Sequence, residues 1–246
     1  MLVLLEAFTL ECALLVLLEA FTFERALLVL LEAFTLERAL LVLHEVFIKM
    51  TQGHIMAVNI YIDQGHNPAG VNAGAEGFGV REQDITYQVG RFLYDILSQD
   101  ERFAARLSRP TPDTSLGYNN TSSLRERVTQ ANDWPADYFI SIHANASTNP
   151  EYNGTEVYTV ASYTPTWYLA MEVLPEIVRR TGTKYNGVFL NPGLYVLRNT
   201  TMPAILVELG YITNYEDNQR MVNNGYQFAY GIYVGLLNYL GLSQIL

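Results

Sequence analysis

Three polar side chains stand at the ends of apolar segments of the sequence. His66 follows the segment VNIYID, His143 follows YFISI, and Glu208 ends AILVE. A fourth polar residue, Glu82, opens a helical pattern after a loop rich in Gly and Asn. Because the active crevice of an open α/β sheet lies outside the carboxyl ends of its strands, we expect these side chains to converge there.

The types of these side chains suit a catalytic zinc site. Two histidines and one carboxylate that leave one coordination position open are a catalytic zinc arrangement. The metal lowers the pKa of water in the open position towards ~7. A second carboxylate beside that water can take its proton and pass it to a leaving amine. The set therefore contains the parts for hydrolysis of an amide with Zn²⁺. Asp63, three residues before His66, could orient a ligand through a hydrogen bond.

Each of these residues also has an ordinary structural interpretation. A histidine after a strand is more often a hydrogen-bonded loop residue than a metal ligand. Glu82 could be an acidic residue favoured by the dipole of a helix N-terminus. Glu208 could pair with an arginine. Sequence spacing alone therefore leaves the convergence of the four side chains as an expectation.

The chain from residue 57 onward has the pattern of an α/β domain. Apolar or β-branched runs predict strands at residues 58–63, 103–107, 138–142, 155–160, 195–197 and 204–208. Apolar residues at helical spacing predict helices at residues 82–98, 123–133, 164–180 and 226–240. We expect Ser122 or Ser123 to cap the second helix and Thr164 the third, with Pro175 kinking or splitting the third. Strands that alternate with helices predict a twisted, mostly parallel sheet flanked by helices.

Residues 1–50 form a low-complexity tandem repeat that differs from the rest of the chain. The unit of 13 residues reads LLVLLEAFTLERA in its third copy and has decayed in its fourth. Leu, Glu and Ala favour a helix, but the polar positions ring it instead of forming one face. A Glu occurs every five to eight residues, so we expect no transmembrane span. We expect a non-catalytic segment, either a recent duplication of coding DNA or a helical oligomerisation segment, with the domain boundary at residues 49–57.

Charge and cysteine content exclude further classes of protein. The formal net charge of -10 argues against a nucleic-acid binder, which needs a basic surface. Cys12 is the only cysteine, so no disulfide within the chain and no Cys-rich metal site can form. The start of the chain has no positively charged region followed by a small-residue cleavage site, so we expect no secretory signal.

Six segments occur in the order found in one known family. They are Asp63-Gln-Gly-His66, Gly79-Val-Arg-Glu82, Leu124-x-x-Arg127-x-x-x-Ala131-Asn132 ahead of Ala136-Asp137, Ser141-Ile-His143-Ala-Asn145-Ala146, Gly154-Thr-Glu-Val-Tyr158 and Glu208-Leu-Gly-Tyr-Ile-Thr-Asn214. Together they resemble the zinc-dependent N-acetylmuramoyl-L-alanine amidases of the amidase 3 type, over roughly residues 58–240. The SIHANA and ExGYITN segments are the most specific parts of the resemblance.

The resemblance implies a fold, an activity and a set of site residues. The family fold is a single α/β domain with a mostly parallel six-stranded sheet, here at residues 57–242. By resemblance His66, Glu82 and His143 hold zinc, and Glu208 is the catalytic carboxylate. The implied reaction is hydrolysis of the amide between N-acetylmuramic acid and L-alanine in bacterial peptidoglycan. The implied location is extracellular, at the cell wall or in the periplasm.

Departures from the family pattern leave the four site positions intact. Gln64 stands where the family usually has Pro, and Asn67 stands where it often has Gly, so we expect a changed loop shape. We expect no wall-binding repeat after the catalytic region. Two rival functions stay open at this point. They are a zinc carboxypeptidase acting on the stem peptide and a catalytically dead wall-binding module.

Overall fold

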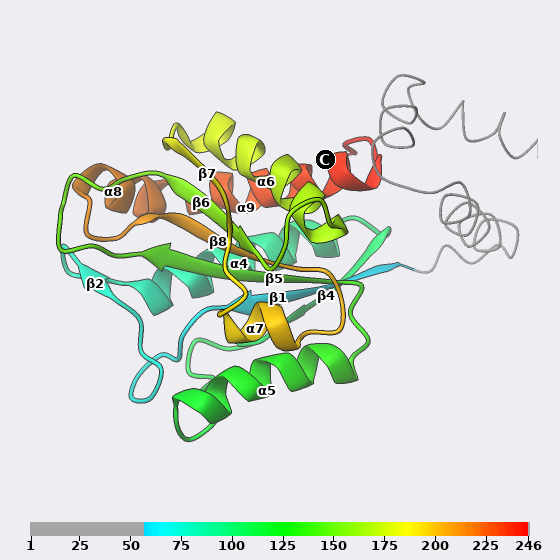
Figure 1. Cartoon of the computed structure of the whole chain (residues 1–246), viewed down its shortest axis with the longest axis horizontal. Helices are drawn as coiled ribbons and strands as arrows, with labels where there is room; N and C mark the ends of the chain where they lie inside the picture. Colours follow the sequence, from blue (N-terminus) through cyan, green and yellow to red (C-terminus); the bar gives the residue numbers. More distant parts are fainter. Residues whose placement is uncertain (1–56, 246) are drawn as a thin grey trace, which may run out of the picture. The chain divides into compact units, whose positions relative to one another are not determined.

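The computed structural model describes residues 57–245, so the predictions for residues 1–50 lie outside the described residues. The elements, labelled as in Figure 1, are β1 Val58–Gln64, β2 Glu76–Gly77, β3 Val80–Arg81, α4 Glu82–Ser98, β4 Phe103–Leu107, α5 Asn120–Asp133, β5 Tyr138–Asn145, β6 Thr155–Thr159, α6 Pro165–Thr181, β7 Tyr185–Leu190, α7 Tyr195–Asn199, β8 Ala204–Tyr211, α8 Tyr215–Asn223 and α9 Gly225–Leu240.

Six strands form one sheet in the order β4-β1-β5-β8-β6-β7. Strands β4, β1, β5 and β8 are parallel to one another, whereas β6 is antiparallel to β8 and parallel to β7. Strands β2 and β3 form a separate antiparallel hairpin before α4. The predicted single α/β domain with a mostly parallel six-stranded sheet is confirmed.

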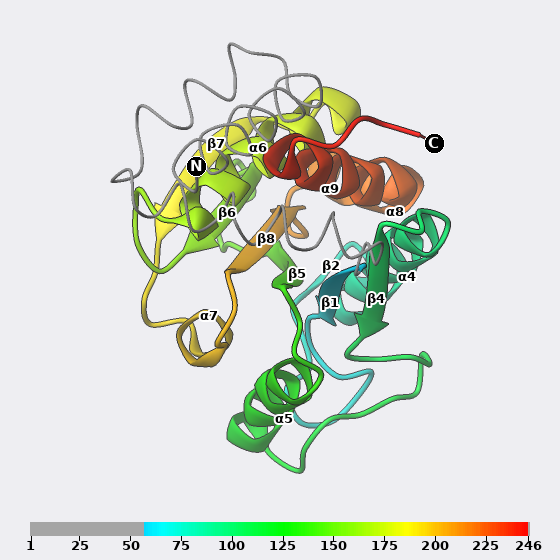
Figure 2. The same cartoon turned by 90° about the vertical axis from the view of Figure 1, so that its right-hand side faces the viewer.

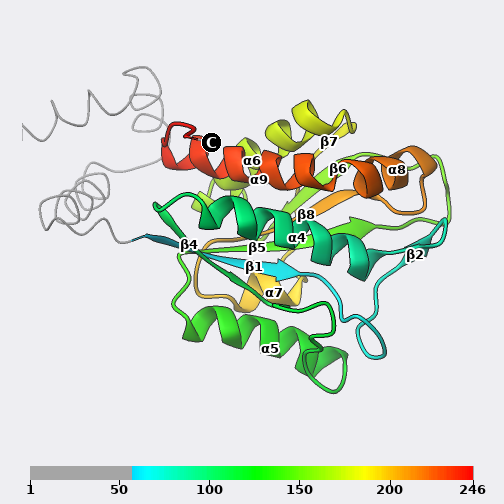
Figure 3. The same ribbon diagram turned by 180° about the vertical axis from the view of Figure 1, so that it is seen from behind.

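Helices cover both faces of this sheet. Helices α4, α6 and α9 lie on one face and α5 and α7 on the other, as the front and back views show (Figures 1 and 3). The view along the sheet shows the same division (Figure 2). In β1, Ile60 and Ile62 belong to the larger apolar core, whereas Tyr61 packs with the smaller core around α5 and α7. Because both faces are buried, β1 and β5 read as continuous apolar runs in the sequence.

The helix α6 begins as predicted but continues through Pro175. The Thr164 side chain accepts a hydrogen bond from the backbone N–H of Trp167, which confirms the predicted cap. The predicted split at Pro175 is wrong, since one helix runs from Pro165 to Thr181. Pro175 lies on the exposed side of the helix. There a carbonyl that loses its helical partner can bind water instead.

The helix α5 begins three residues earlier than predicted. Its N-cap is Asn119, so the predicted caps Ser122 and Ser123 are wrong. The Asn119 side chain accepts from the Ser122 backbone N–H at 2.8 Å, and Ser122 Oγ accepts from the Asn119 N–H at 3.0 Å. This reciprocal capping box satisfies two backbone donors, one more than a single cap would satisfy.

The strand predicted at residues 195–197 is wrong, because these residues form the short helix α7. Side chains at its C-terminal end donate hydrogen bonds to backbone carbonyls four residues earlier. Asn199 Nδ2 donates to the Tyr195 carbonyl, and Thr200 Oγ1 donates to the Val196 carbonyl. The sixth strand of the sheet is β7, which the sequence did not predict. Gly187, with φ of 132°, interrupts its pattern, and several of its side chains are exposed at the sheet edge.

Candidate metal centre

His66 lies in the turn that follows β1. Its backbone has φ of 68°, in the left-handed region that residues with a Cβ seldom adopt. Its Nδ1 atom is 3.2 Å from the carbonyl oxygen of Asn72. In the tautomer with its proton on Nδ1, the ring donates to this carbonyl and presents the Nε2 lone pair to a metal.

His143 lies within β5, two residues before that strand ends. The prediction that the strand stops before His143 is therefore wrong, although the histidine still lies near its carboxyl end. The rings of His143 and His66 meet edge to face, with centroids 4.8 Å apart. A Cβ on Gly65 would lie 2.6 Å from Cε1 and Nε2 of His143. Only glycine at position 65 therefore lets the turn after β1 approach the ring of His143 this closely.

Glu82 is the first residue of α4 and lies between the two histidines. Its Oε1 atom is 2.9 Å from His66 Nε2 and 3.1 Å from His143 Nδ1. The backbone N–H of Ala144 donates to Oε1 at 3.0 Å, and that of Ala75 donates to Oε2 at 2.9 Å. Each carboxylate oxygen is thus held by one backbone N–H, and Oε1 is also contacted by both imidazoles.

The surroundings of Glu82 favour its ionised form. Burial alone would raise the pKa of this carboxyl group, but the hydrogen bonds and charges of His143 and His66 together lower it by more. The net pKa lies below the usual range of a glutamate. Its place at a helix N-terminus adds to the same effect. A carboxylate that is already ionised is ready to bind a cation.

These three side chains have the composition and spacing of a metal site. One ligand atom from each of His66, Glu82 and His143 lies within 4.8 Å of the others. Zinc holds His nitrogen and carboxylate oxygen at about 2.0–2.2 Å, so ligand atoms of one site lie about 3–4 Å apart. The predicted trio is therefore brought together in the fold, and its donor set suits zinc.

Glu208 lies on β8 beside this group. The prediction that β8 ends at Glu208 is wrong, because the strand continues to Tyr211. In the sheet Glu208 is the direct partner of His143 on β5 and of Glu156 on β6. Its Oε2 atom is buried and has no hydrogen-bond partner within the described part of the chain. Burial, followed by the charges of Glu82 and Glu156, raises the pKa of Glu208 well above its usual value.

Asp63 bonds to an arginine and a serine. Its Oδ1 accepts from Arg127 Nη1 at 2.6 Å, and its Oδ2 accepts from Ser141 Oγ at 2.8 Å. Burial raises the pKa of this carboxyl, but the charge and hydrogen bond of Arg127 bring it below its usual value. No hydrogen bond between Asp63 and either histidine ring is found among residues 57–245. The expected direct orientation of a ligand by Asp63 is thus replaced by contacts through Arg127 and Ser141.

The two departures from the family pattern are both buried and hydrogen-bonded. Gln64 accepts from the Arg109 N–H and donates to the Tyr87 carbonyl. Asn67 accepts from the Leu116 N–H at 3.0 Å and donates to the Leu116 carbonyl at 2.9 Å. The polar side chains therefore tie the turn after β1 to the segment that follows β4.

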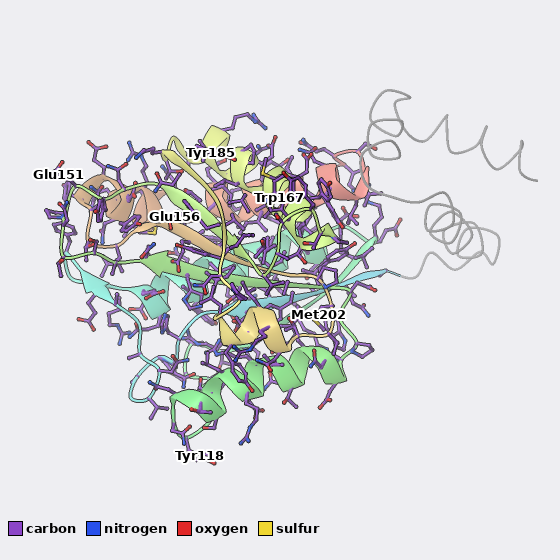
Figure 4. The ribbon with its side chains drawn as sticks, viewed as in Figure 1. Tyr118, Glu151, Glu156, Trp167, Tyr185 and Met202 are labelled. Atoms are coloured by element: carbon purple, nitrogen blue, oxygen red, sulfur yellow. The ribbon has the colours of Figure 1, made fainter. Side chains whose placement is uncertain are left out.

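Glu156 is a site residue for which sequence reasoning gave no role. Figure 4 labels it on β6, near the end of the sheet where α8 lies. Its two oxygens accept four hydrogen bonds, from the Tyr158 and Tyr211 hydroxyls and the Asn145 and Asn186 side chains. The segment Gly154–Tyr158, which resembles a family motif, could have drawn attention to Glu156. It does not reveal the hydrogen-bond partners of this side chain. These donors satisfy its carboxylate, unlike that of Glu208.

Two histidines and a carboxylate at ligand distance, with a half-buried glutamate on the neighbouring strand β8, define a candidate hydrolytic metal centre in an α/β fold. The family model described as N-acetylmuramoyl-L-alanine amidase matches residues 60–238. The chain belongs to this family.

Relatives and solved structures agree with this assignment. The chain is 30% identical over 189 residues to the N-acetylmuramoyl-L-alanine amidase LytC of Bacillus subtilis, covering 75% of this chain and 36% of LytC. It is 32% identical over 191 residues to the amidase CwlM of Bacillus licheniformis, covering 76% of this chain and 70% of CwlM. The crystal structure of an N-acetylmuramoyl-L-alanine amidase from Clostridium difficile 630 matches with a TM-score of 0.67 and 33% identity, covering 75% of this chain and 97% of that one. The chain thus spans about a third of the length of LytC.

Among the described residues, no helix has the length and apolar content needed to cross a membrane.

Proposed function

We propose that this chain hydrolyses the amide between the lactyl group of N-acetylmuramic acid and L-alanine in bacterial peptidoglycan. The observation that carries the proposal is the group of His66, Glu82 and His143 with Glu208 as the cross-strand neighbour of His143. Family membership and the names of the relatives support the same reaction. We further propose that the protein acts at the cell wall, where this substrate lies.

The three ligands would be His66 through Nε2, His143 through Nδ1 and Glu82 through Oε1. These are the atoms that face one another at 2.9 and 3.1 Å. Zinc held there supplies Lewis-acid polarisation of the amide carbonyl and lowers the pKa of the attacking water. The Asn72 carbonyl fixes the ring of His66, and the Ala75 and Ala144 amides fix Glu82. The ligands are therefore arranged before the substrate arrives.

Glu208 would move the protons of the reaction. Its raised pKa and its unpartnered Oε2 suit a carboxylate that accepts a proton from the attacking water. The water oxygen bonds to the amide carbon, and the bond from carbon to nitrogen breaks. Glu208 then gives the same proton to the departing nitrogen of L-alanine. One water molecule is consumed for each amide bond that is cleaved, and the products are a carboxylic acid and a free amine.

End-group analysis of digested peptidoglycan tests this activity. The full chain is incubated with purified peptidoglycan, and the new chemical ends are identified. New N-terminal L-alanine without new reducing sugar is the expected result. Free D-amino acids would instead identify a carboxypeptidase acting on the stem peptide. Binding without any product would identify a dead wall-binding module, and either result would overturn the proposed amidase activity.

The catalytic unit is proposed to be residues 57–242, without the repeat. A chain that begins near Gly53 is expected to fold and to cleave peptidoglycan as fast as the full chain, because all four proposed site residues follow Val58. Its solubility should improve, since an apolar segment is removed. Thermal melting and product release, measured side by side on the two chains, check this. Loss of folding on truncation would mean that the repeat contributes to the core and that the boundary is wrong.

A further inference from the structure

Arg127 binds the turn that carries His66 with several hydrogen bonds. Its guanidinium lies on α5 and is 1% exposed. Nη1 donates to Asp63 Oδ1 and to the Gln64 carbonyl, both at 2.6 Å, and Nη2 donates to the His66 carbonyl at 2.6 Å. A longer bond of 3.3 Å joins Nη2 to Asn67 Oδ1. One side chain thus contacts four of the five residues from Asp63 to Asn67.

The backbone at His66 needs such support. A left-handed φ of 68° is unfavourable for a residue with a Cβ and persists only where the surroundings fix it. The carbonyls on either side of Gly65, those of Gln64 and His66, accept from the two different Nη atoms of Arg127. The planar guanidinium therefore spans the turn and sets the direction of both peptide groups.

The direction of this backbone decides where the His66 ring lies. The ring reaches Glu82 Oε1 at 2.9 Å from Nε2 and the Asn72 carbonyl at 3.2 Å from Nδ1. A return of His66 to an ordinary backbone conformation would turn its Cβ and move Nε2 away from Glu82. The orientation of one candidate ligand thus depends on bonds made to its own main chain.

Arg127 is also connected to the strand that carries the second histidine. Asp63 accepts from Arg127 through Oδ1 and from Ser141 through Oδ2. Ser141 lies on β5, two residues before His143. The Asp63–Arg127 pair is buried at 1% side-chain exposure on both sides. It therefore links the turn of His66 to the strand of His143 inside the protein.

We propose that Arg127 is the positioning residue of the metal site. It holds the turn from Asp63 to Asn67 in the one conformation that presents His66 Nε2 to Glu82 and the metal. The inference rests on the proposed zinc site and assigns to Arg127 no contact with substrate. Loss of an outer-shell partner of a metal ligand typically weakens metal binding by about 10–100-fold.

The chain contains a matched comparison in Arg109. This second arginine is also 1% exposed. Its guanidinium donates to the carbonyls of Gln83 and Pro112 and lies over the ring of Tyr87. In the described part of the chain, no hydrogen bond joins this guanidinium to the backbone of residues 63–67. Replacing Arg109 with lysine therefore disturbs a buried arginine of equal exposure but leaves the bonds to the Gln64 and His66 carbonyls in place.

Zinc affinity measured beside thermal stability tests the proposal. The full chain and the variants Arg127→Lys and Arg109→Lys are stripped of metal, and the zinc affinity of each is measured by competition with a chromophoric chelator. Lysine keeps the charge beside Asp63 but cannot bond both carbonyls from one fork. We expect zinc binding about 10–100-fold weaker in Arg127→Lys and close to wild type in Arg109→Lys, at comparable losses of Tm. Arg127→Gln, neutral and of similar length, is a second variant in case Arg127→Lys does not fold.

The outcomes separate the two proposals. A wild-type chain without zinc affinity overturns the zinc site itself and, with it, the role of Arg127. Wild-type zinc affinity in a folded Arg127 variant overturns the role of Arg127 alone. Equal weakening in Arg109→Lys and Arg127→Lys assigns the effect to general destabilisation and also overturns it. Failure of both Arg127 variants to fold, with Arg109→Lys folded, assigns Arg127 to the stability of the fold and has the same consequence.

Discussion

Replacement of Glu208 by glutamine is expected to slow peptidoglycan cleavage by about 10²–10⁴-fold, the usual cost of losing a positioned acid–base group. Glutamine keeps the size of the side chain and part of its hydrogen bonding but cannot accept the proton of the attacking water. Zinc content and Tm should change little, because Glu208 is not among the three proposed ligands. Turnover and zinc content are measured on the same sample of Glu208→Gln.

Glu156→Gln is the matched control for this variant. Glu156 is a buried glutamate directly opposite Glu208 in the sheet, but four donors satisfy its carboxylate. We expect a much smaller loss of rate in Glu156→Gln than in Glu208→Gln. Near-wild-type turnover of Glu208→Gln would refute its catalytic role. Loss of zinc together with activity in Glu208→Gln would instead make Glu208 a fourth ligand.

Replacement of His143 by alanine is expected to remove most of the bound zinc, and the activity with it. A site of three protein ligands cannot lose one and keep its affinity, so the effect should exceed the 10–100-fold that loss of an outer-shell partner costs. Removal of the ring also leaves Glu82 Oε1 without one of its three partners. Zinc per chain is measured by elemental analysis after dialysis.

Asn145→Ala provides the control on the same strand. Asn145 lies two residues beyond His143 on β5, and its side chain bonds to Glu156 instead of to any of the three proposed ligands. This variant should keep one zinc per chain. Full metal occupancy in His143→Ala would contradict the assignment of His143 as a ligand.

Much of the fold was predictable because both faces of the central strands are buried. Strands β1, β5 and β8 are apolar runs in the sequence, and α4 was predicted with its exact bounds, since its apolar spacing begins and ends sharply. The errors fall on short elements at the margins. Apolar spacing could not distinguish a strand at residues 195–197 from the five-residue helix α7, whose identity depends on side chains that bond backwards from Asn199 and Thr200.

The candidate metal ligands were predictable because their residue types and their positions after apolar runs indicate metal binding. His66, Glu82 and His143 were expected at one edge of the sheet, and the fold brings them together. The supporting residues were not predictable in their roles. Arg127 lies 61 positions from His66 in the sequence, and their bond appears only once α5 packs over the end of β1. The expected hydrogen bond from Asp63 to a ligand is not formed, because Arg127 occupies its Oδ1 and Ser141 its Oδ2.

Metal titration of the stripped full chain tests the central claim most directly. All metal is removed with a strong chelator, zinc is added back in known amounts, and the release of N-terminal L-alanine from peptidoglycan is followed. We predict that cleavage is lost on stripping and returns in proportion to zinc, saturating at one zinc per chain, because the three proposed ligands form a single site. Full cleavage by the metal-free chain, or no recovery at one equivalent of zinc, would contradict the account.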